Sequence, residues 1–158
     1  MDLLLVRHGI AEEHGTRTND AERVLTEEGR QKTRRVAKRL RELDVQLEIV
    51  LTSPLIRARQ TAEILIEEGL ASLLELFTPL SPGGALADFR QWLVAHPAVT
   101  SAAIVGHQPD LGLWAEALLW GSPRRGLDIK KAGVVRIAIE PTALTGNLLW
   151  FIPPRVLL

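Results

Sequence analysis

The sequence predicts an α/β fold: a three-layer α/β/α sandwich around a mostly parallel, mixed sheet of about six strands, ending in an antiparallel hairpin. Short apolar runs alternate with segments of helical periodicity along most of the 158 residues. The first run, Leu3–Val6, is apolar on both faces, which is typical of a central strand in a parallel sheet. Near the end of the chain, apolar and polar residues alternate in a strand over 135–139, and a second strand follows a short connection containing Gly146. We expect one domain over residues 1–158.

Start and stop signals delimit the elements. Thr26 is a good N-cap followed by two glutamates, so a helix extends to about residue 43. Ser53 before Pro54 predicts an N-cap with proline at the first helical position, and Gly69 is a natural stop. The other expected elements are a functional loop over 10–25, strands at Ile49–Leu51, 72–77, Ala102–Val105 and Asn147–Ile152, and helices over Ala85–Ala95 and Pro109–Leu119.

Composition excludes several classes of function. The 19 basic and 19 acidic residues give a formal net charge of zero, so no overall field favours a nucleic acid or a membrane surface as partner. The absence of cysteine excludes disulfides, thiolate nucleophiles and cysteine metal sites. No apolar run has the length of a transmembrane helix and no signal peptide is recognisable, so we expect a cytoplasmic protein.

Two histidines follow buried strands directly. Arg7, His8 and Gly9 come after the first strand, and Gly106 and His107 come after the strand at 102–105. Since ligands bind beyond the carboxyl ends of parallel strands, neighbouring strands would place both histidines over one crevice. The alternative is that each histidine is only a structural group at a strand end.

A third group of residues suits an anion. Arg57 lies near the start of the second helix, whose free N–H groups would face the crevice, while Arg59 is about 200° further round and is expected in solvent. The planar fork of an arginine matches two phosphate oxygens. Arg7, Arg57 and the helix start at Pro109 therefore favour phosphoryl transfer.

These residues resemble the motifs of the histidine phosphatase superfamily. The matching segments are Arg7-His8-Gly9 (the RHG motif), Leu25-Thr26-x-x-Gly29, Ser53-Pro54-x-x-Arg57-Ala58-x-Gln60-Thr61-Ala62 and Gly106-His107, in the family's order within residues 1–115. The short chain and Leu80-Ser81-Pro82-Gly83-Gly84 resemble the SixA-type branch, which removes phosphate from phosphohistidine in proteins.

The resemblance implies a role for each site residue. His8 would be the nucleophile that forms a phosphohistidine intermediate, and Arg7, Arg57 and His107 would hold the phosphoryl oxygens. Two nearby guanidinium groups would keep His8 neutral by lowering its pKa. We expect neither a metal nor a cofactor, because the arginines supply the positive charge.

The general acid of the family's phosphomonoesterases has no clear counterpart. Gln108 stands where acid phosphatases carry an aspartate, Asp110 is too far along the helix, and Glu75 is only a weak candidate because a charge at a strand edge explains it equally well. A protonated imidazole leaves without such an acid, so phosphohistidine is the expected substrate. Arg23 and His14, in the first loop, are further candidates for substrate contact.

Other interpretations remain open. One is a small-molecule phosphomonoesterase of the same superfamily, and another is a non-catalytic phosphate-binding regulatory module. The first helix indicates either a docking surface for a phosphorylated protein, such as a histidine phosphotransfer domain, or a solvated basic face. Its basic residues are Arg30, Lys32, Arg34, Arg35, Lys38, Arg39 and Arg41.

Overall fold

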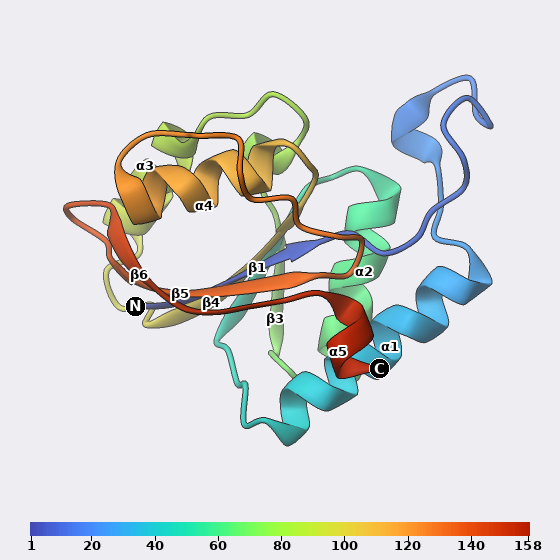
Figure 1. Cartoon of the computed structure of the whole chain (residues 1–158), viewed down its shortest axis with the longest axis horizontal. Coiled ribbons are helices and arrows are strands. Elements are labelled where there is room, and N and C mark those ends of the chain that lie inside the picture. The colour runs from blue at the N-terminus through green and yellow to red at the C-terminus, as the bar shows by residue number, and fades with distance from the viewer.

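A six-stranded mixed sheet runs through the middle of the molecule (Figure 1). The structure is a computed structural model that describes residues 1–158. Four strands are parallel, β5 is antiparallel to β1, and the spatial order is β3-β2-β4-β1-β5-β6. The elements are β1 (Asp2–Arg7), η1 (Asp20–Glu22), α1 (Glu27–Glu42), β2 (Ile49–Thr52), α2 (Ile56–Glu67), β3 (Leu73–Leu76), η2 (Thr78–Leu80), α3 (Leu86–Ala95), β4 (Ser101–Gly106), α4 (Asp110–Trp120), β5 (Val134–Glu140), β6 (Thr145–Ile152) and α5 (Pro154–Leu157).

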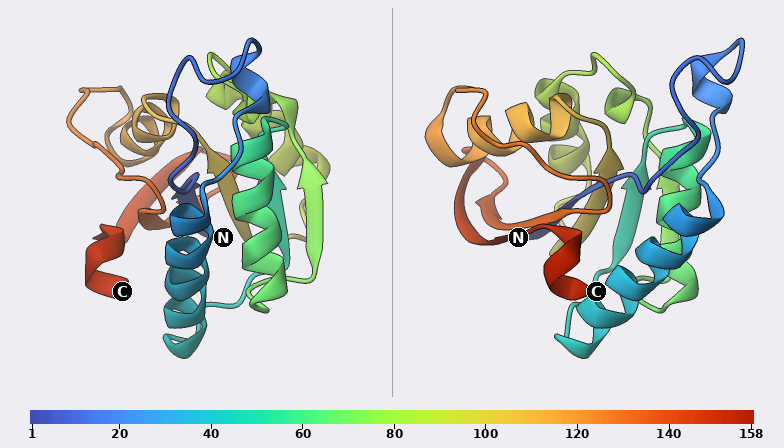
Figure 2. Two further views of the ribbon diagram at one scale, coloured as in Figure 1. Left: turned by 90° about the vertical axis from the view of Figure 1, so that its right-hand side faces the viewer. Right: turned by 45° about the vertical axis from the view of Figure 1, so that its right-hand side comes forward.

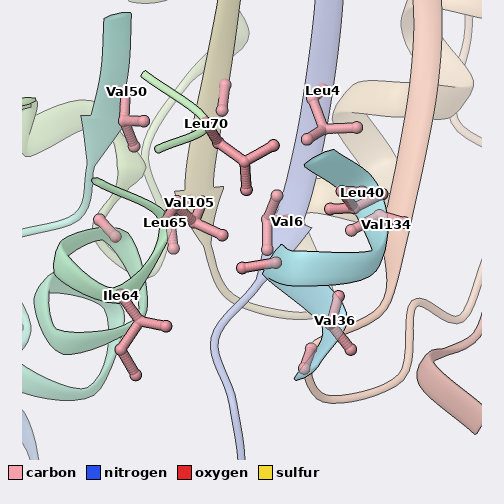
Figure 3. Packing of buried hydrophobic residues seen from close by; sticks show 14 of the residues in the cluster. Leu4, Val6, Val36, Leu40, Val50, Ile64, Leu65, Leu70, Val105 and Val134 are labelled. Carbon is pink, nitrogen blue, oxygen red and sulfur yellow. The ribbon is translucent and has the colours of Figure 1, made fainter. Parts of the chain in front are cut away.

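Helices cover both faces of this sheet, which confirms the three-layer α/β/α prediction. Helices α1, α2 and α5 lie on one face, and α3 and α4 lie on the other (Figures 1 and 2). Successive residues of a strand point to opposite faces. Accordingly Leu4 and Val6 pack against α1 and α2 (Figure 3), whereas Leu3 and Leu5 pack against α3 and α4. No helix is long and apolar enough to cross a membrane.

Most predicted boundaries hold. Thr26 caps α1 by accepting a hydrogen bond from the Gly29 N–H at 3.0 Å, and Gly69 ends α2 with a φ of +81°. The strand predicted at 72–77 is the short edge strand β3, whose side chains, Glu75 included, are exposed. Helix α3 stops before His96-Pro97, as expected.

Two local predictions are wrong. Helix α2 begins at Ile56, not at Pro54, and its N-cap is Leu55, whose apolar side chain cannot cap the helix. The Ser53 hydroxyl oxygen accepts from the Leu55 N–H at 3.2 Å and lies 2.8 Å from Nε2 of His107. Gly146 lies inside β6 opposite Ile139 rather than in the hairpin connection, since the strand begins two residues before the predicted Asn147.

Gly29 is needed where α1 meets the segment after β1. A Cβ built on Gly29 would overlap the carbonyl group of Ile10, which is backbone and has little freedom to move aside. We expect Gly29→Ala to lower the free energy of unfolding by about 1–3 kcal/mol, even though alanine favours helix more than glycine does. Urea unfolding measures this, with Gly126→Ala as control because a Cβ there meets nothing within 4 Å. Equal losses in the two variants would contradict the prediction.

Candidate active site

Sheet pairing brings the two strand-end histidines together. Strands β1 and β4 are parallel neighbours in which Arg7 pairs with Gly106, so the next residues, His8 and His107, lie side by side. Their ring centroids are 5.2 Å apart and the rings are tilted by 53°. Both side chains belong to buried residues, with 6% of His8 and 4% of His107 exposed. The predicted juxtaposition of the two histidines is therefore present.

His8 presents one ring nitrogen as a base. Its Nδ1 lies 2.7 Å from the Gly9 carbonyl oxygen, which can only accept, so Nδ1 carries the hydrogen. The pKa of His8 is lowered to about 3, mainly by burial and also by His107, Arg57 and Arg7, against the opposing effect of the Gly9 hydrogen bond. The ring is consequently neutral at pH 7, and Nε2 carries the lone pair.

His107 is held by the end of β2. Its Nε2 lies 2.8 Å from the hydroxyl oxygen of Ser53, which is fully buried and follows the strand beside β4. Its Nδ1 is buried and has no hydrogen-bond partner within the protein. Burial, followed by the charge of Arg57, lowers the pKa of His107 to about 4, so this ring is also neutral at pH 7.

Two guanidinium groups complete this cluster. Arg57, in the first turn of α2, is only 4% exposed, and Arg7 donates from Nη1 to the Ile129 carbonyl oxygen at 2.9 Å. The Nε atoms of both arginines are buried without a partner in the protein. Arg59 points into solvent and pairs with Glu63 at 3.0 Å, as its position on the helix predicted.

Asp20 is a site residue that the sequence did not reveal. Its carboxylate accepts from Arg57 at 3.1 Å and from Arg23 at 2.7 Å, and its backbone carbonyl accepts from Arg57 at 2.9 Å. The hydrogen bond from Arg23, followed by the charge of Arg57, keeps the pKa of Asp20 below its usual range. Asn19 caps the short turn that carries Asp20, a local signal that could have marked the segment as ordered.

The two first-loop candidates for substrate contact, Arg23 and His14, both contact the Asp20 carboxylate. Arg23 lies close enough for its charge to lower the pKa of Arg57 and of His107. The His14 ring is 87% exposed and contacts Asp20 at 3.1 Å, so it lies at the rim.

The positions considered for a general acid form no hydrogen bond with the site histidines or arginines. Glu75 is exposed on the edge strand, and Asp110 accepts from the Gly83 N–H at 2.7 Å. The Gln108 amide donates to the Leu127 carbonyl oxygen and accepts from the Gly112 N–H. No group of three or more His, Asp or Glu side chains is arranged to hold a metal ion.

The two lowered histidine pKa values predict a pH-dependent stability. Between about pH 6.5 and 4 the unfolded chain protonates these histidines while the folded protein does not, so stability decreases as the pH falls. Each histidine should contribute a slope of about 1.4 kcal/mol per pH unit in this window. Urea unfolding at several pH values measures the slope, and His8→Asn/His107→Asn should reduce it. An unchanged slope in that variant would contradict the assignment.

Comparisons with known proteins agree with this geometry. Residues 3–75 match the family model described as histidine phosphatase superfamily (branch 1). The chain is 45% identical over 137 residues to an uncharacterised protein of Picosynechococcus sp., covering 85% of this chain and 83% of that protein. It is 32% identical over 116 residues to the phosphohistidine phosphatase SixA of Escherichia coli K12, covering 71% of this chain and 70% of that protein.

A solved structure extends the similarity to the whole chain. The protein histidine phosphatase SixA in complex with tungstate superposes with a TM-score of 0.88 at 27% identity, covering 99% of both chains. Similarity in sequence, fold and motif order thus points to one family. The chain belongs to the histidine phosphatase superfamily and is similar to SixA.

Proposed function

We propose that this protein is a phosphatase that transfers a phosphoryl group from a phosphohistidine in a protein to Nε2 of His8 and then to water. The observation that carries the proposal is the state of His8. Its ring is neutral, its Nδ1 hydrogen is donated to Gly9, and its Nε2 lone pair lies among buried cationic and neutral donors. A binding module needs cations but has no use for such a nucleophile.

The proposed reaction has two displacements. In the first, Nε2 of His8 attacks phosphorus, the P–N bond of the substrate breaks, and its imidazole leaves as a neutral ring because its other nitrogen carries a proton. In the second, water attacks phosphorus, the P–Nε2 bond breaks, and inorganic phosphate leaves. The hydrogen of His8 stays on Nδ1 and is donated to the Gly9 carbonyl oxygen throughout, which keeps the ring oriented.

Three buried donors would bind the phosphoryl oxygens, where negative charge collects in the transition state. Nε of Arg7, Nε of Arg57 and Nδ1 of His107 have no partner within the protein. A hydrogen donated by the Ser53 hydroxyl to Nε2 of His107 places that ring's own hydrogen on Nδ1, where it can be donated to phosphate. The two guanidinium charges supply the positive charge, so we propose a reaction without a metal ion.

The proposed preference for P–N over P–O cleavage rests on the state and position of the carboxylates, none of which is placed as a proton donor. Asp20 is held ionised by Arg23 and Arg57, so it is a poor proton donor at pH 7. Glu75 is on the edge strand and Asp110 is bound to Gly83. An alkoxide leaving group requires an acid, whereas a protonated imidazole does not. Similarity to SixA supports the same substrate class, and tungstate in that structure is a tetrahedral oxyanion like phosphate.

A substrate panel in buffer containing EDTA tests the proposal. It compares a phosphohistidine peptide, phosphoramidate, phosphoserine, phosphotyrosine and small phosphomonoesters. We expect the two P–N substrates to have the highest kcat/KM and activity to survive chelation. Faster hydrolysis of the phosphomonoesters would favour the small-molecule phosphatase, and binding of phosphate with no turnover of any substrate would favour the regulatory module.

A further inference from the structure

A groove of about 500 Å³ has Arg7 in its lining, whereas neither His8 nor His107 lines it. Its basic residues come from four parts of the chain: Arg7 at the end of β1, Lys32 on α1, Lys130 and Lys131 before β5, and Arg155 on α5. The short helix α5 lies beside α1, which brings the last residues of the chain to the groove (Figure 2).

Backbone hydrogen bonds fasten one wall of the groove to the active site. The Ala132 N–H donates to the carbonyl oxygens of Arg7 and His8, both at 3.1 Å, and the Arg7 side chain donates to the Ile129 carbonyl oxygen. The tight turn at Lys130, closed by a 2.7 Å hydrogen bond from the Gly133 N–H, exposes Lys130 and Lys131. This wall of the groove is therefore held against the backbone of Arg7 and His8.

The charged side chains of the groove are all cationic, and the last residue, Leu158, also lines it. Five cationic side chains line it and no aspartate or glutamate side chain does, although the whole chain has zero formal net charge. Lys32 pairs with Glu28 at 2.8 Å and Lys130 pairs with Asp128, whereas Lys131 and Arg155 form no ion pair. These two exposed cations are available to a partner.

The rest of the basic face of α1 is only partly paired with acids. Arg34 pairs with Glu67 and Glu68, and Arg39 pairs with Glu42. The other basic residues of this helix outside the groove form no ion pair: Arg30, Arg35, Lys38 and Arg41. Only its Lys32 end takes part in the groove.

Apolar groups between the cations favour a protein as the occupant. Ile10 and Pro154 line the groove, and an adjoining hollow that shares Lys130, Pro154 and Arg155 adds Phe151, Pro153 and Asp128, the partner of Lys130. Together these hollows offer mainly cationic and apolar contacts over an area larger than a phosphate. A protein surface in which acidic side chains surround apolar ones is complementary to this pattern.

We propose that the groove binds an acidic surface of the phosphoprotein substrate next to its phosphohistidine, with Lys131 and Arg155 as the main contacts. This inference rests on the proposed function. The acidic side chains of the substrate pair with the groove while the phosphoryl group reaches His8. The groove would thus select among phosphohistidine proteins by the charge around the modified residue.

Two phosphohistidine peptides of equal length, one flanked by glutamate and the other by glutamine, test the proposal. We expect the wild-type protein to have a kcat/KM about tenfold higher for the glutamate peptide, with a smaller ratio at high salt. Lys131→Glu/Arg155→Glu should bring the ratio to one or below. The control Lys38→Glu/Arg90→Glu has the same charge change at two exposed residues outside the groove and should keep the wild-type ratio.

Equal kcat/KM for the two peptides in the wild type, or an undiminished ratio in the groove variant, would overturn the proposal. If neither the wild type nor any variant hydrolyses either peptide or phosphoramidate, the proposed function has failed. Binding of an unphosphorylated, fluorescein-labelled glutamate peptide then tests the groove separately. Tighter binding by wild type than by the groove variant supports it, and equal binding refutes it. Groove-dependent binding that is tighter for phosphatidylserine vesicles or an oligodeoxynucleotide than for the peptide would also refute it.

Discussion

His8→Ala is expected to lower kcat for phosphoramidate hydrolysis by about 10⁴-fold or more, because removal of a covalent nucleophile has effects of this size. The variant should also lose the phosphoryl group that radiolabelled substrate leaves on the wild-type protein. A phosphorus–nitrogen bond survives alkali and is lost in acid, whereas an ester on serine survives acid and is lost in alkali, so the label is compared after alkaline and after acid treatment. Rapid-quench labelling and steady-state kinetics on the same samples measure both effects.

His96→Ala is the matched control for the loss of a histidine. His96 ends α3 on the opposite face of the sheet, where its ring stacks on Trp92 at a centroid distance of 4.2 Å. This variant should keep both the label and the rate. Label on His8→Ala equal to that on wild type would place the intermediate on another residue and refute the mechanism.

Arg57→Ala is expected to lower kcat/KM by about 10²–10³-fold, the usual effect of removing one buried donor to an oxyanion. Arg57 is buried beside both histidines, so its charge acts on the phosphoryl group with little screening by solvent. Arg57→Lys retains the charge but lacks the planar fork, so it should recover only part of the rate. Steady-state kinetics with phosphoramidate measure both variants.

Arg59→Ala is the control on the same helix. Its guanidinium pairs with Glu63 in solvent, so removal should change kcat/KM by less than about twofold. Urea unfolding must accompany these assays, since Arg57 also anchors Asp20 through two hydrogen bonds. A stable Arg57→Ala protein with the same kcat/KM as Arg59→Ala would remove Arg57 from the phosphate site.

The sequence by itself determined the alternation of strands and helices and the residues at the strand ends. Leu3–Val6 is apolar on both faces because it lies between two helical layers, so its pattern records its place in the sheet. The positions of Arg7, His8 and His107 follow from where two buried strands stop. These are local properties of the sequence, so they can be predicted without knowing which segments are neighbours in the fold.

Only the tertiary structure decided which of these residues meet. Because β4 lies between β2 and β1, His107 contacts both Ser53 and His8, and the Ser53 hydroxyl is shared between that ring and the Leu55 N–H. Asp20 reaches Arg57 across a loop, and Lys131 and Arg155 join Arg7 in one groove. Strand order and loop packing depend on contacts between residues distant in sequence, which periodicity and capping signals do not record. The sequence therefore predicted that the two strand-end histidines lie together, whereas their hydrogen-bond partners and the charged groove at Arg7 required the fold.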